Sequence, residues 1–276
     1  MINPPITQKI MDINKLFILF CIAVACISCK EDIITQEKIT GSVTDCQGRV
    51  YATVQIGDQW WMAENLSCTQ YDTESERQPA APATFVPVPL QARTGTAVAY
   101  GPFYVDDSAD TTQYSGNLTA IQRSKLGLLY SWAAVVGLTN TTSQTTDFVG
   151  NRQGICPNGW HVPTDAEWSV LINNLGGENN AGSVMKTPTG WYTGDNYAEG
   201  NNSSGFSVLP AGYDLGVLNP DGKTPATFGT GFDASFWSAS ANAWYRGFSC
   251  NSSVVQRMPM AKYKYFSVRC VKNAQE

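Results

Sequence analysis

Residues 155–168 read ICPNGWHVPTDAEW, and this stretch carries the local signals that decide how the chain folds. Thr164 is followed three residues later by Glu167, which is the capping-box pattern at the start of a helix. Pro163 comes directly before this pair and suits a chain that enters a helix from extended structure. The stretch therefore predicts a helix that begins at Thr164.

The residues that follow Thr164 continue the helical pattern. Apolar side chains recur at the spacing of one helix face, and the glycine pair at 176–177 provides an end signal. We predict an amphipathic helix of about three turns. Its buried face is formed by Trp168, Leu171, Ile172 and Leu175.

The same stretch raises the question of a catalytic or metal site, because it holds His161, the only histidine of the chain. Asp165 and Glu167 fall in the first helical turn, where carboxylates interact favourably with the helix dipole. His161 has no second histidine and no evident nucleophile beside it. We interpret the stretch as structural.

The composition indicates an exported, loop-rich domain with much β-structure. The chain has 276 residues, of which 43% are apolar and only 15% are charged. It contains eight tryptophans and twelve tyrosines. The net charge of −5 argues against nucleic acid as a partner, because phosphate binding needs a basic surface.

The N-terminus has the pattern of a secretory signal peptide. Residues 16–27 form an apolar run that is too short to span a bilayer comfortably, and Lys9 and Lys15 provide a positive flank. The residues before Cys29 resemble a bacterial lipobox. We predict that residues 1–28 are removed, that Cys29 is lipidated, and that residues 29–38 form the anchor and its polar tether.

The first residues after Cys29 indicate where the protein is exported. Lys30, Glu31 and Asp32 resemble the surface-export signal of Bacteroidota lipoproteins. We therefore predict an outer-membrane lipoprotein that faces the cell exterior and is held by its lipid. Cys26 is a competing lipid site, and an ordinary cleaved signal peptide is the alternative.

The rest of the chain predicts an α+β domain of short antiparallel strands, two main helices and long loops. Residues 39–66 contain β-rich runs separated by turn signals. Residues 70–122 are rich in Pro, Ala, Thr and polar residues, and we interpret them as a surface insertion with one strand within 97–105. Residues 126–137 predict a short buried helix, and several short strands follow the helix after Thr164.

Five cysteines remain after Cys29, and an exported protein occupies a compartment that permits disulfides. An odd number leaves at least one of them free or paired elsewhere. The spacing alone does not give the connectivity. The five residues are Cys46, Cys68, Cys156, Cys250 and Cys270.

Residues 155–168 and three further segments resemble the Fibrobacter succinogenes major paralogous domain family. The three are VYATVQIGDQWWMAENL (50–66), LGLLYSWAAV (126–135) and FWSASANAWYRGFSC with YFSVRCV (236–271). All four occur in the order of the family. The resemblance implies one domain over residues 39–272, with 70–122 as a variable insertion.

This family in turn is distantly similar to C-type-lectin-like domains and to the formylglycine-generating enzyme, which implies a C-type-lectin-like or sulfatase-modifying-factor-like fold. In such folds a cysteine near the first helices often bonds one near the C-terminal strand. The resemblance therefore implies a disulfide between Cys156 and Cys270. Cys46 with Cys68 is a second pairing, which leaves Cys250 free.

The resemblance also introduces an oxidase as the third functional candidate. A formylglycine-generating enzyme works through a cysteine pair near its late R-G-x-S segment. Here that segment contains Cys250 without a close second cysteine, so we predict that the chain is not an enzyme. Carboxylates are scattered, and nothing in the sequence places two of them together as a glycosidase requires.

No cofactor and no metal are predicted. One histidine and no C-x-x-C pair among the later cysteines disfavour zinc. Asp106, Asp107 and Asp110 have the chemistry to bind calcium, but a polar loop is the preferred interpretation. The sequence also lacks the E-P-N, Q-P-N and W-N-D motifs of calcium-dependent sugar binding in lectins.

The leading functional prediction is that loops of a lectin-like domain bind a glycan or another surface ligand. Metal-free sugar recognition uses aromatic platforms beside polar groups, and two segments carry this pattern. The alternative for each aromatic residue is packing in the core. A structural or adhesive role in a cell-surface assembly, with protein contacts, is the second functional hypothesis. The candidate binding residues are Trp191, Tyr192, Tyr197, Trp244, Tyr245 and Arg246.

Overall fold

The computed structural model shows one compact unit from residue 38 onward. The predicted signal peptide and lipidated Cys29, most of the predicted insertion, and the three aspartates at 106–110 lie outside the residues that it describes. The described residues are 37–72, 102–104, 119–138, 147–148, 150–218 and 225–274.

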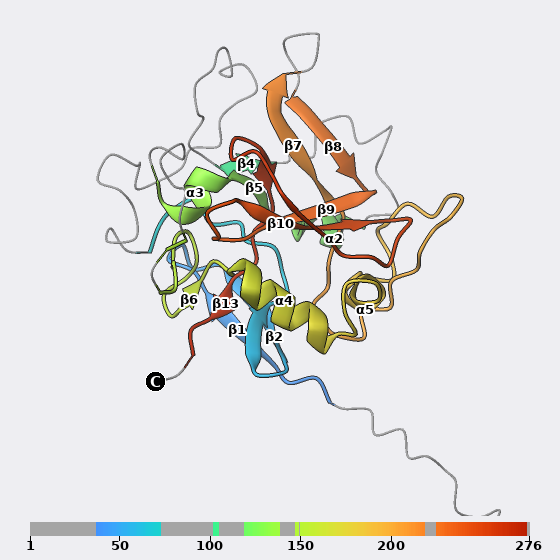
Figure 1. Ribbon diagram of the computed structural model, residues 1–276, viewed down its shortest axis with the longest axis horizontal. Coiled ribbons are helices and arrows are strands. Elements are labelled where there is room, and N and C mark those ends of the chain that lie inside the picture. The colour runs from blue at the N-terminus through green and yellow to red at the C-terminus, as the bar shows by residue number, and fades with distance from the viewer. Residues whose placement is uncertain are drawn as a thin grey trace, which may run out of the picture. The chain divides into compact units, whose positions relative to one another are not determined.

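One sheet joins the first strands of the domain to the last one. Its order in the described chain is β1-β2-β3-β13-β6, with antiparallel pairing throughout. The C-terminal strand thus lies between two strands from the first part of the domain (Figure 1). The bounds are β1 Thr40–Thr44, β2 Val50–Ile56, β3 Gln59–Met62, β6 Trp160–His161 and β13 Val271–Lys272.

The second sheet is larger, and its order is β11-β10-β9-β7-β12-β5-β4, with β8 paired to β7. Its pairs are antiparallel except that β7 and β9 run parallel. The strand predicted within residues 97–105 is present as β4. The bounds are β4 Pro102–Tyr104, β5 Leu128–Ser131, β7 Ala211–Leu218, β8 Pro225–Thr230, β9 Asp233–Trp237, β10 Trp244–Ser249, β11 Gln256–Pro259 and β12 Tyr265–Phe266.

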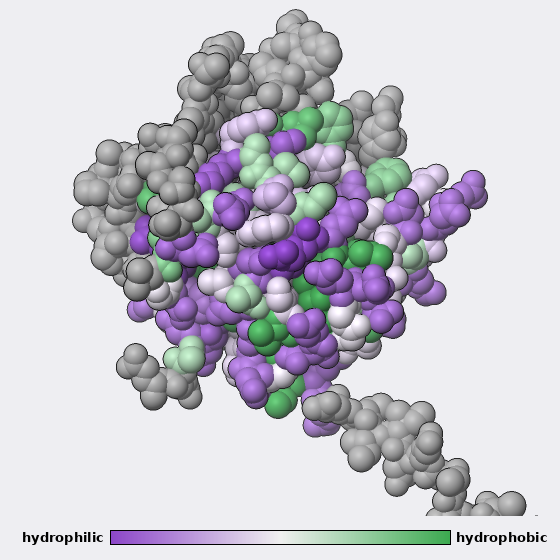
Figure 2. Space-filling view, viewed as in Figure 1, coloured by the Kyte–Doolittle hydropathy of each residue, from purple (hydrophilic) through white to green (hydrophobic). Residues whose placement is uncertain are grey.

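In the described chain the helices are few and short beside the two sheets. The domain is therefore rich in sheet, which is consistent with the predicted α+β class. None of the helices within the described ranges combines the length and the apolar character that a membrane crossing needs. Hydrophilic side chains cover much of the described surface on the face that Figure 2 shows, with smaller hydrophobic groups between them. The bounds are α2 Ala120–Ser124, α3 Trp132–Val136, α4 Asp165–Asn174 and α5 Ala181–Met185.

Helix α4 begins as the sequence predicts. The backbone N–H of Glu167 donates to the Thr164 hydroxyl at 3.2 Å, and the Glu167 carboxylate accepts from the Thr164 N–H at 2.8 Å. The side chains of Trp168, Leu171 and Ile172 are buried. The capping box is therefore formed in full, and the predicted apolar face packs inward.

The helix predicted over residues 126–137 is wrong in its first half, which forms strand β5. All four residues of β5 are buried, and the strand pairs with β4 and β12. Ser131 caps the short helix α3 that follows, and Gly137 ends it in the left-handed region at φ 70°. A short, fully apolar run does not distinguish a buried strand from a buried helix.

The hydrophobic residues form two large clusters, and both sheets contribute to each of them. Helix α3 packs into the first cluster, and α4 packs into the second. Trp61 of β3 lies 4.8 Å from Trp168 of α4 between ring centroids, and Phe236 of β9 lies 5.8 Å from Trp168. The helix that begins at the opening stretch thus connects the two sheets.

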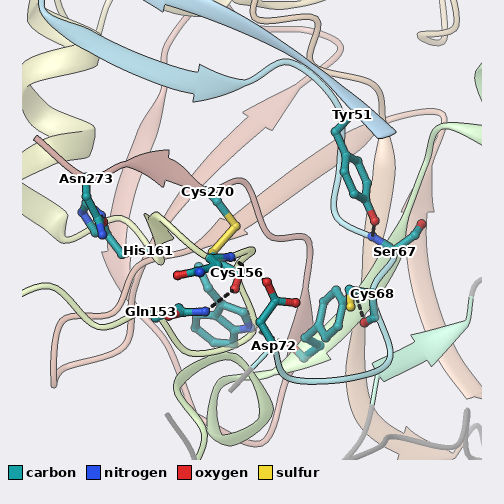
Figure 3. Close-up of a disulfide and its surroundings, with 12 residues drawn as sticks. Tyr51, Ser67, Cys68, Asp72, Gln153, Cys156, His161, Cys270 and Asn273 are labelled. Carbon is teal, nitrogen blue, oxygen red and sulfur yellow. Dashed lines mark hydrogen bonds between the residues drawn. A yellow bond between two sulfur atoms is a disulfide. The ribbon is translucent and has the colours of Figure 1, made fainter. Parts of the chain in front are cut away.

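The structure contains the disulfide between Cys156 and Cys270 that the family resemblance implies. The two Cα atoms are 5.9 Å apart, and 114 positions separate the residues in the sequence. Figure 3 shows the bond in the first core cluster, near the segment of Cys68 and Asp72. A loop of this length gives a stabilisation of about 4–5 kcal/mol if chain entropy is the main effect.

Candidate functional site

The histidine of the opening stretch is held inside the fold. His161 is 1% exposed, and its Nε2 lies 2.7 Å from a carboxylate oxygen of Glu167. Its Nδ1 lies 2.6 Å from Oδ1 of Asn273, next to the C-terminal strand (Figure 3). Both ring nitrogens therefore join structural elements, which agrees with the structural interpretation of this stretch.

Glu167 shows how closely this junction is built. Burial raises the pKa of its carboxyl group, but hydrogen bonds from His161 and Thr164 outweigh that effect and hold the pKa below its usual value. The carboxylate is therefore committed to capping α4 and to holding His161.

Three of the predicted binding residues are buried, and their assignment to a binding surface is wrong. Trp191 and Arg246 are 0% exposed, and Tyr245 is 7% exposed. Trp191 packs in the second core cluster and Tyr245 in the first. Because these side chains are buried, a ligand outside the protein does not reach them. The prediction failed because large aromatic side chains near Gly and Asn in the sequence fill a core as readily as they bind a ligand.

Arg246 instead fixes helix α4 to strand β10. Its guanidinium donates to the carboxylate of Asp165 at 2.6 Å and to the Ser169 hydroxyl at 3.0 Å. Arg257 on β11 also pairs with Asp165, at 2.6 Å. Burial raises the pKa of Asp165, but the two arginines outweigh it and hold the pKa below its usual value. Arg246 is thus a structural hydrogen-bonding arginine.

Trp244 and Tyr197 are half-buried, and neighbouring residues pack against their rings. The guanidinium carbon of Arg257 lies 4.0 Å from the ring centroid of Trp244, so this cation covers one face of the indole. Tyr197 packs against the second core cluster. Neighbouring side chains therefore cover part of each ring.

Tyr192 is different, because it is 47% exposed. Its ring stacks on Phe232 with centroids 4.6 Å apart and an interplanar angle of 27°. Its backbone N–H donates to the carbonyl of Gly231 at 2.7 Å, which fixes it beside the turn between β8 and β9. Phe232 packs against the tyrosine ring, Gly194 lies close to its hydroxyl end, and the residue remains partly exposed.

A second stacked pair lies at the other end of the same turn. Tyr213 on β7 and Phe228 on β8 are register partners with ring centroids 6.2 Å apart. Phe228 is 43% exposed. Two glycines allow the turn that joins the pairs, since Gly229 and Gly231 have φ of 75° and 88°, in the region that favours glycine.

Asp233 begins β9 directly after this turn, and its carboxylate lies beside Gly229. A Cβ atom on Gly229 would lie 2.7 Å from a carboxylate oxygen of Asp233, so only glycine leaves room for it. Burial raises the pKa of Asp233, and a hydrogen bond with the Ser249 side chain opposes this only in part. We name this site the aromatic edge. It consists of Tyr192, Tyr213, Phe228, Phe232 and Asp233.

The aromatic edge offers apolar ring faces beside a hydrogen-bond acceptor. Such rings stack on the C–H faces of a sugar, and a carboxylate accepts hydrogen bonds from sugar hydroxyls. Of this group, only Tyr192 was a candidate from the sequence pattern. The paired glycines at 229 and 231, flanked by Phe228 and Phe232, are the signal in the sequence that marks the rest.

Substitution of Asp233 by asparagine is expected to stabilise the protein at pH 7. The folded state raises the pKa of Asp233 above its unfolded value, so it favours the protonated form. Ionisation of Asp233 therefore costs folding stability. This cost is absent below the unfolded pKa, grows as the pH rises from the unfolded to the folded pKa, and is complete above the folded pKa. We expect the melting-temperature advantage of Asp233→Asn over the native protein to shrink as pH falls toward 4, near the unfolded pKa. An advantage that is constant over pH 4–8 would contradict this assignment.

The cysteines do not form the arrangement of the oxidase candidate. Cys250 is 7% exposed and is a free thiol, while Cys270 is bonded to Cys156. The second pairing considered from the sequence is not bonded, because Cys46 and Cys68 are thiols with sulfurs 3.9 Å apart. In the described ranges, no group of three or more His, Cys, Asp or Glu side chains is arranged to hold a metal ion.

Comparison with known proteins agrees with the architecture. A family model, the Fibrobacter succinogenes major domain, matches residues 54–272. The chain belongs to this family. The match begins in β2 and ends in β13, so it includes the second sheet, the disulfide and the aromatic edge, while β1 lies before it. No curated protein and no solved structure matches the chain.

Proposed function

We propose that this member of the Fibrobacter succinogenes major domain family is a non-catalytic surface lipoprotein that binds a saccharide at its aromatic edge. In this proposal Cys29 carries the lipid, and the domain faces the exterior of a Bacteroidota cell. The observation that carries the proposal is the exposed ring of Tyr192, which stacks on Phe232, the residue before Asp233 in the sequence. The neighbouring Phe228 provides a second exposed ring.

The charge of the site favours a neutral saccharide over an anionic one. The protein has a net charge of −5, and the aromatic edge itself contributes a carboxylate. A sulfated or uronic-acid polymer would meet repulsion from both. We therefore propose a neutral polysaccharide, recognised by stacking and by its hydroxyl groups.

The architecture is proposed to be C-type-lectin-like. Two features support this: the C-terminal strand β13 closes a sheet with early strands of the domain, and a disulfide links Cys156 to the segment before β13. In this proposal the ligand site lies at the short turn between β8 and β9.

The proposal is tested by binding of the purified protein to a panel of neutral and anionic polysaccharides. We expect a neutral polymer to bind and Tyr192→Ala or Phe228→Ala to weaken it by about tenfold, which corresponds to one lost stacking contact of about 1.4 kcal/mol. Tyr263→Ala is the matched control, since Tyr263 is 56% exposed and lies outside the aromatic edge. No binding by folded protein across the panel, or equal losses in all three variants, would contradict the proposal.

An adhesive or structural role is the second candidate, and strand β11 favours it. This strand stands at the end of the second sheet in the described chain, and all of its residues are exposed. An exposed edge strand can accept a strand from a partner protein. Loss of self-association or of partner binding in Met258→Lys, with saccharide binding absent, would favour this role.

A further inference from the structure

Two thiols face each other at the first sheet, away from the known disulfide bond. Cys46 lies in the turn between β1 and β2, and Cys68 lies in the segment after β3. Their sulfur atoms are 3.9 Å apart, and both thiols are free. Cys46 is exposed, whereas Cys68 is 1% exposed. A reagent in solution therefore reaches one sulfur of the pair and not the other.

The backbone around the two thiols is held in place by hydrogen bonds on both sides of the pair. The Gln47 side chain donates to the Thr69 hydroxyl at 3.0 Å and accepts from the Thr69 N–H at 2.8 Å. The N–H of Cys46 donates to the Asp72 carboxylate at 3.0 Å. The segments that carry the thiols are thus already adjacent, with the two sulfurs 3.9 Å apart.

We propose that Cys46 and Cys68 form a dithiol that closes to a second disulfide when the chain meets a disulfide oxidant. The thiolate of exposed Cys46 attacks the oxidant R–S–S–R, which forms a mixed disulfide and releases one R–SH. The thiolate of Cys68 then attacks the Cys46 sulfur and releases the second R–SH. In total, two protein thiols are oxidised to one disulfide, and the oxidant is reduced to two thiols.

The surroundings of the pair make this closure slow without a catalyst. Burial, together with the Asp72 carboxylate, raises the pKa of Cys46. Burial is also the main cause that raises the pKa of Cys68, to about 11, and Asp45 and Asp72 contribute in the same direction. Because the thiolate is the attacking species, Asp72→Asn is expected to accelerate oxidation by glutathione disulfide several-fold.

The closed bond would join the turn between β1 and β2 to the segment after β3. Cys68 and the Cys156–Cys270 disulfide belong to the same core cluster, and Asp72 accepts from the N–H of Asn158 on the neighbouring loop (Figure 3). The two bonds would therefore fasten adjacent parts of one core. This inference is independent of saccharide binding.

Peptide mapping of the full chain tests the proposal directly. Trypsin cuts after Lys38, Arg49 and Arg77, so the two cysteines fall on separate peptides, 39–49 and 50–77. After treatment with glutathione disulfide, we expect these peptides to migrate as one linked species without reductant and to separate with it. Cys250→Ser is the control and should give the same map. Two freely alkylated peptides, or a link from Cys68 to Cys156 or Cys270, would overturn the proposal.

A stability measurement provides a second test that does not depend on mapping. Cys46→Ser leaves the backbone contacts of the turn in place and removes only an exposed thiol. Under oxidising conditions we expect the native chain to melt about 5–10 °C above Cys46→Ser. With the pair left reduced the difference should disappear. Equal melting temperatures after complete oxidation would overturn the proposal.

Discussion

Replacement of Arg269 by alanine is expected to lower the free energy of unfolding by about 3–5 kcal/mol, one of the largest effects of any single substitution in this chain. Arg269 is 1% exposed and lies just before β13. It donates to the Asn65 side chain at 2.7 Å and to the carbonyls of Met62, Phe206 and Ser207. Without the guanidinium these buried acceptors lose their donor.

The site is also shaped for a planar cation. The guanidinium carbon lies 4.7 Å from the ring centroid of Phe206 and 5.5 Å from that of Phe236. Burial lowers the pKa of Arg269 to about 9, so the group is still charged at neutral pH. Arg269→Lys keeps the charge but not the fork of donors, and we expect it to recover less than half of the lost stability.

Urea unfolding at pH 7 checks both Arg269 variants. Arg49→Ala serves as the control, because Arg49 is exposed and its expected change is within about 0.5 kcal/mol. If Arg269→Lys unfolded at the same urea concentration as the native protein, the planar hydrogen-bonding role would be wrong.

The neighbouring residues Trp191 and Tyr192 are expected to lose very different amounts of stability on truncation. Trp191→Ala should cost about 3–5 kcal/mol, because it empties a fully buried site in the second core cluster. The indole N–H donates to Thr187 at 3.3 Å, and the ammonium of Lys186 lies 5.2 Å from the ring centroid. Tyr192→Ala should cost no more than about 1 kcal/mol, since the tyrosine is half exposed.

Thermal or urea unfolding of the two variants checks this contrast. The saccharide-binding assay adds a second comparison, because Tyr192→Ala is expected to lose affinity for the saccharide while it stays folded. Similar unfolding midpoints for the two variants would contradict the assignment of Trp191 to the core and Tyr192 to the surface.

Helix α4 could be predicted from the sequence because its signals are local. Thr164 and Glu167 are three residues apart, and their reciprocal hydrogen bonds involve no distant part of the chain. The apolar spacing that follows selects the buried face in the same way. The Cys156–Cys270 bond has no such local signal and is implied only by the similarity of the family to C-type-lectin-like folds.

The aromatic edge could not be predicted in the same way, because its members come from distant segments. Tyr192 stacks on Phe232, and Tyr213 meets Phe228 only through the pairing of β7 with β8. The sequence surroundings of an aromatic residue also do not predict its exposure. Trp191 and Tyr192 are adjacent, yet the first is buried and the second is exposed. An aromatic residue beside Gly and Asn is equally suited to a core and to a surface until its partners are known.

Buried cations were missed for a related reason. Lys186 is 0% exposed, and its ammonium donates to the carbonyls of Ala198, Ser249 and Ser252 at 2.6–2.9 Å. In a chain with many irregular connections, backbone carbonyls lack sheet partners and need other donors. Lys186 and Arg269 supply those donors, and nothing in their local sequence indicates it.

Nitration of exposed tyrosines tests the central claim, saccharide binding at the aromatic edge, most directly. Tyr192 and Tyr263 are 47% and 56% exposed, so tetranitromethane should modify both in the free protein. With a bound neutral polysaccharide, we expect nitration of Tyr192 to fall several-fold while that of Tyr263 stays unchanged, as mass spectrometry of peptic peptides would show. Equal nitration of Tyr192 in the free and the saturated protein would contradict the account.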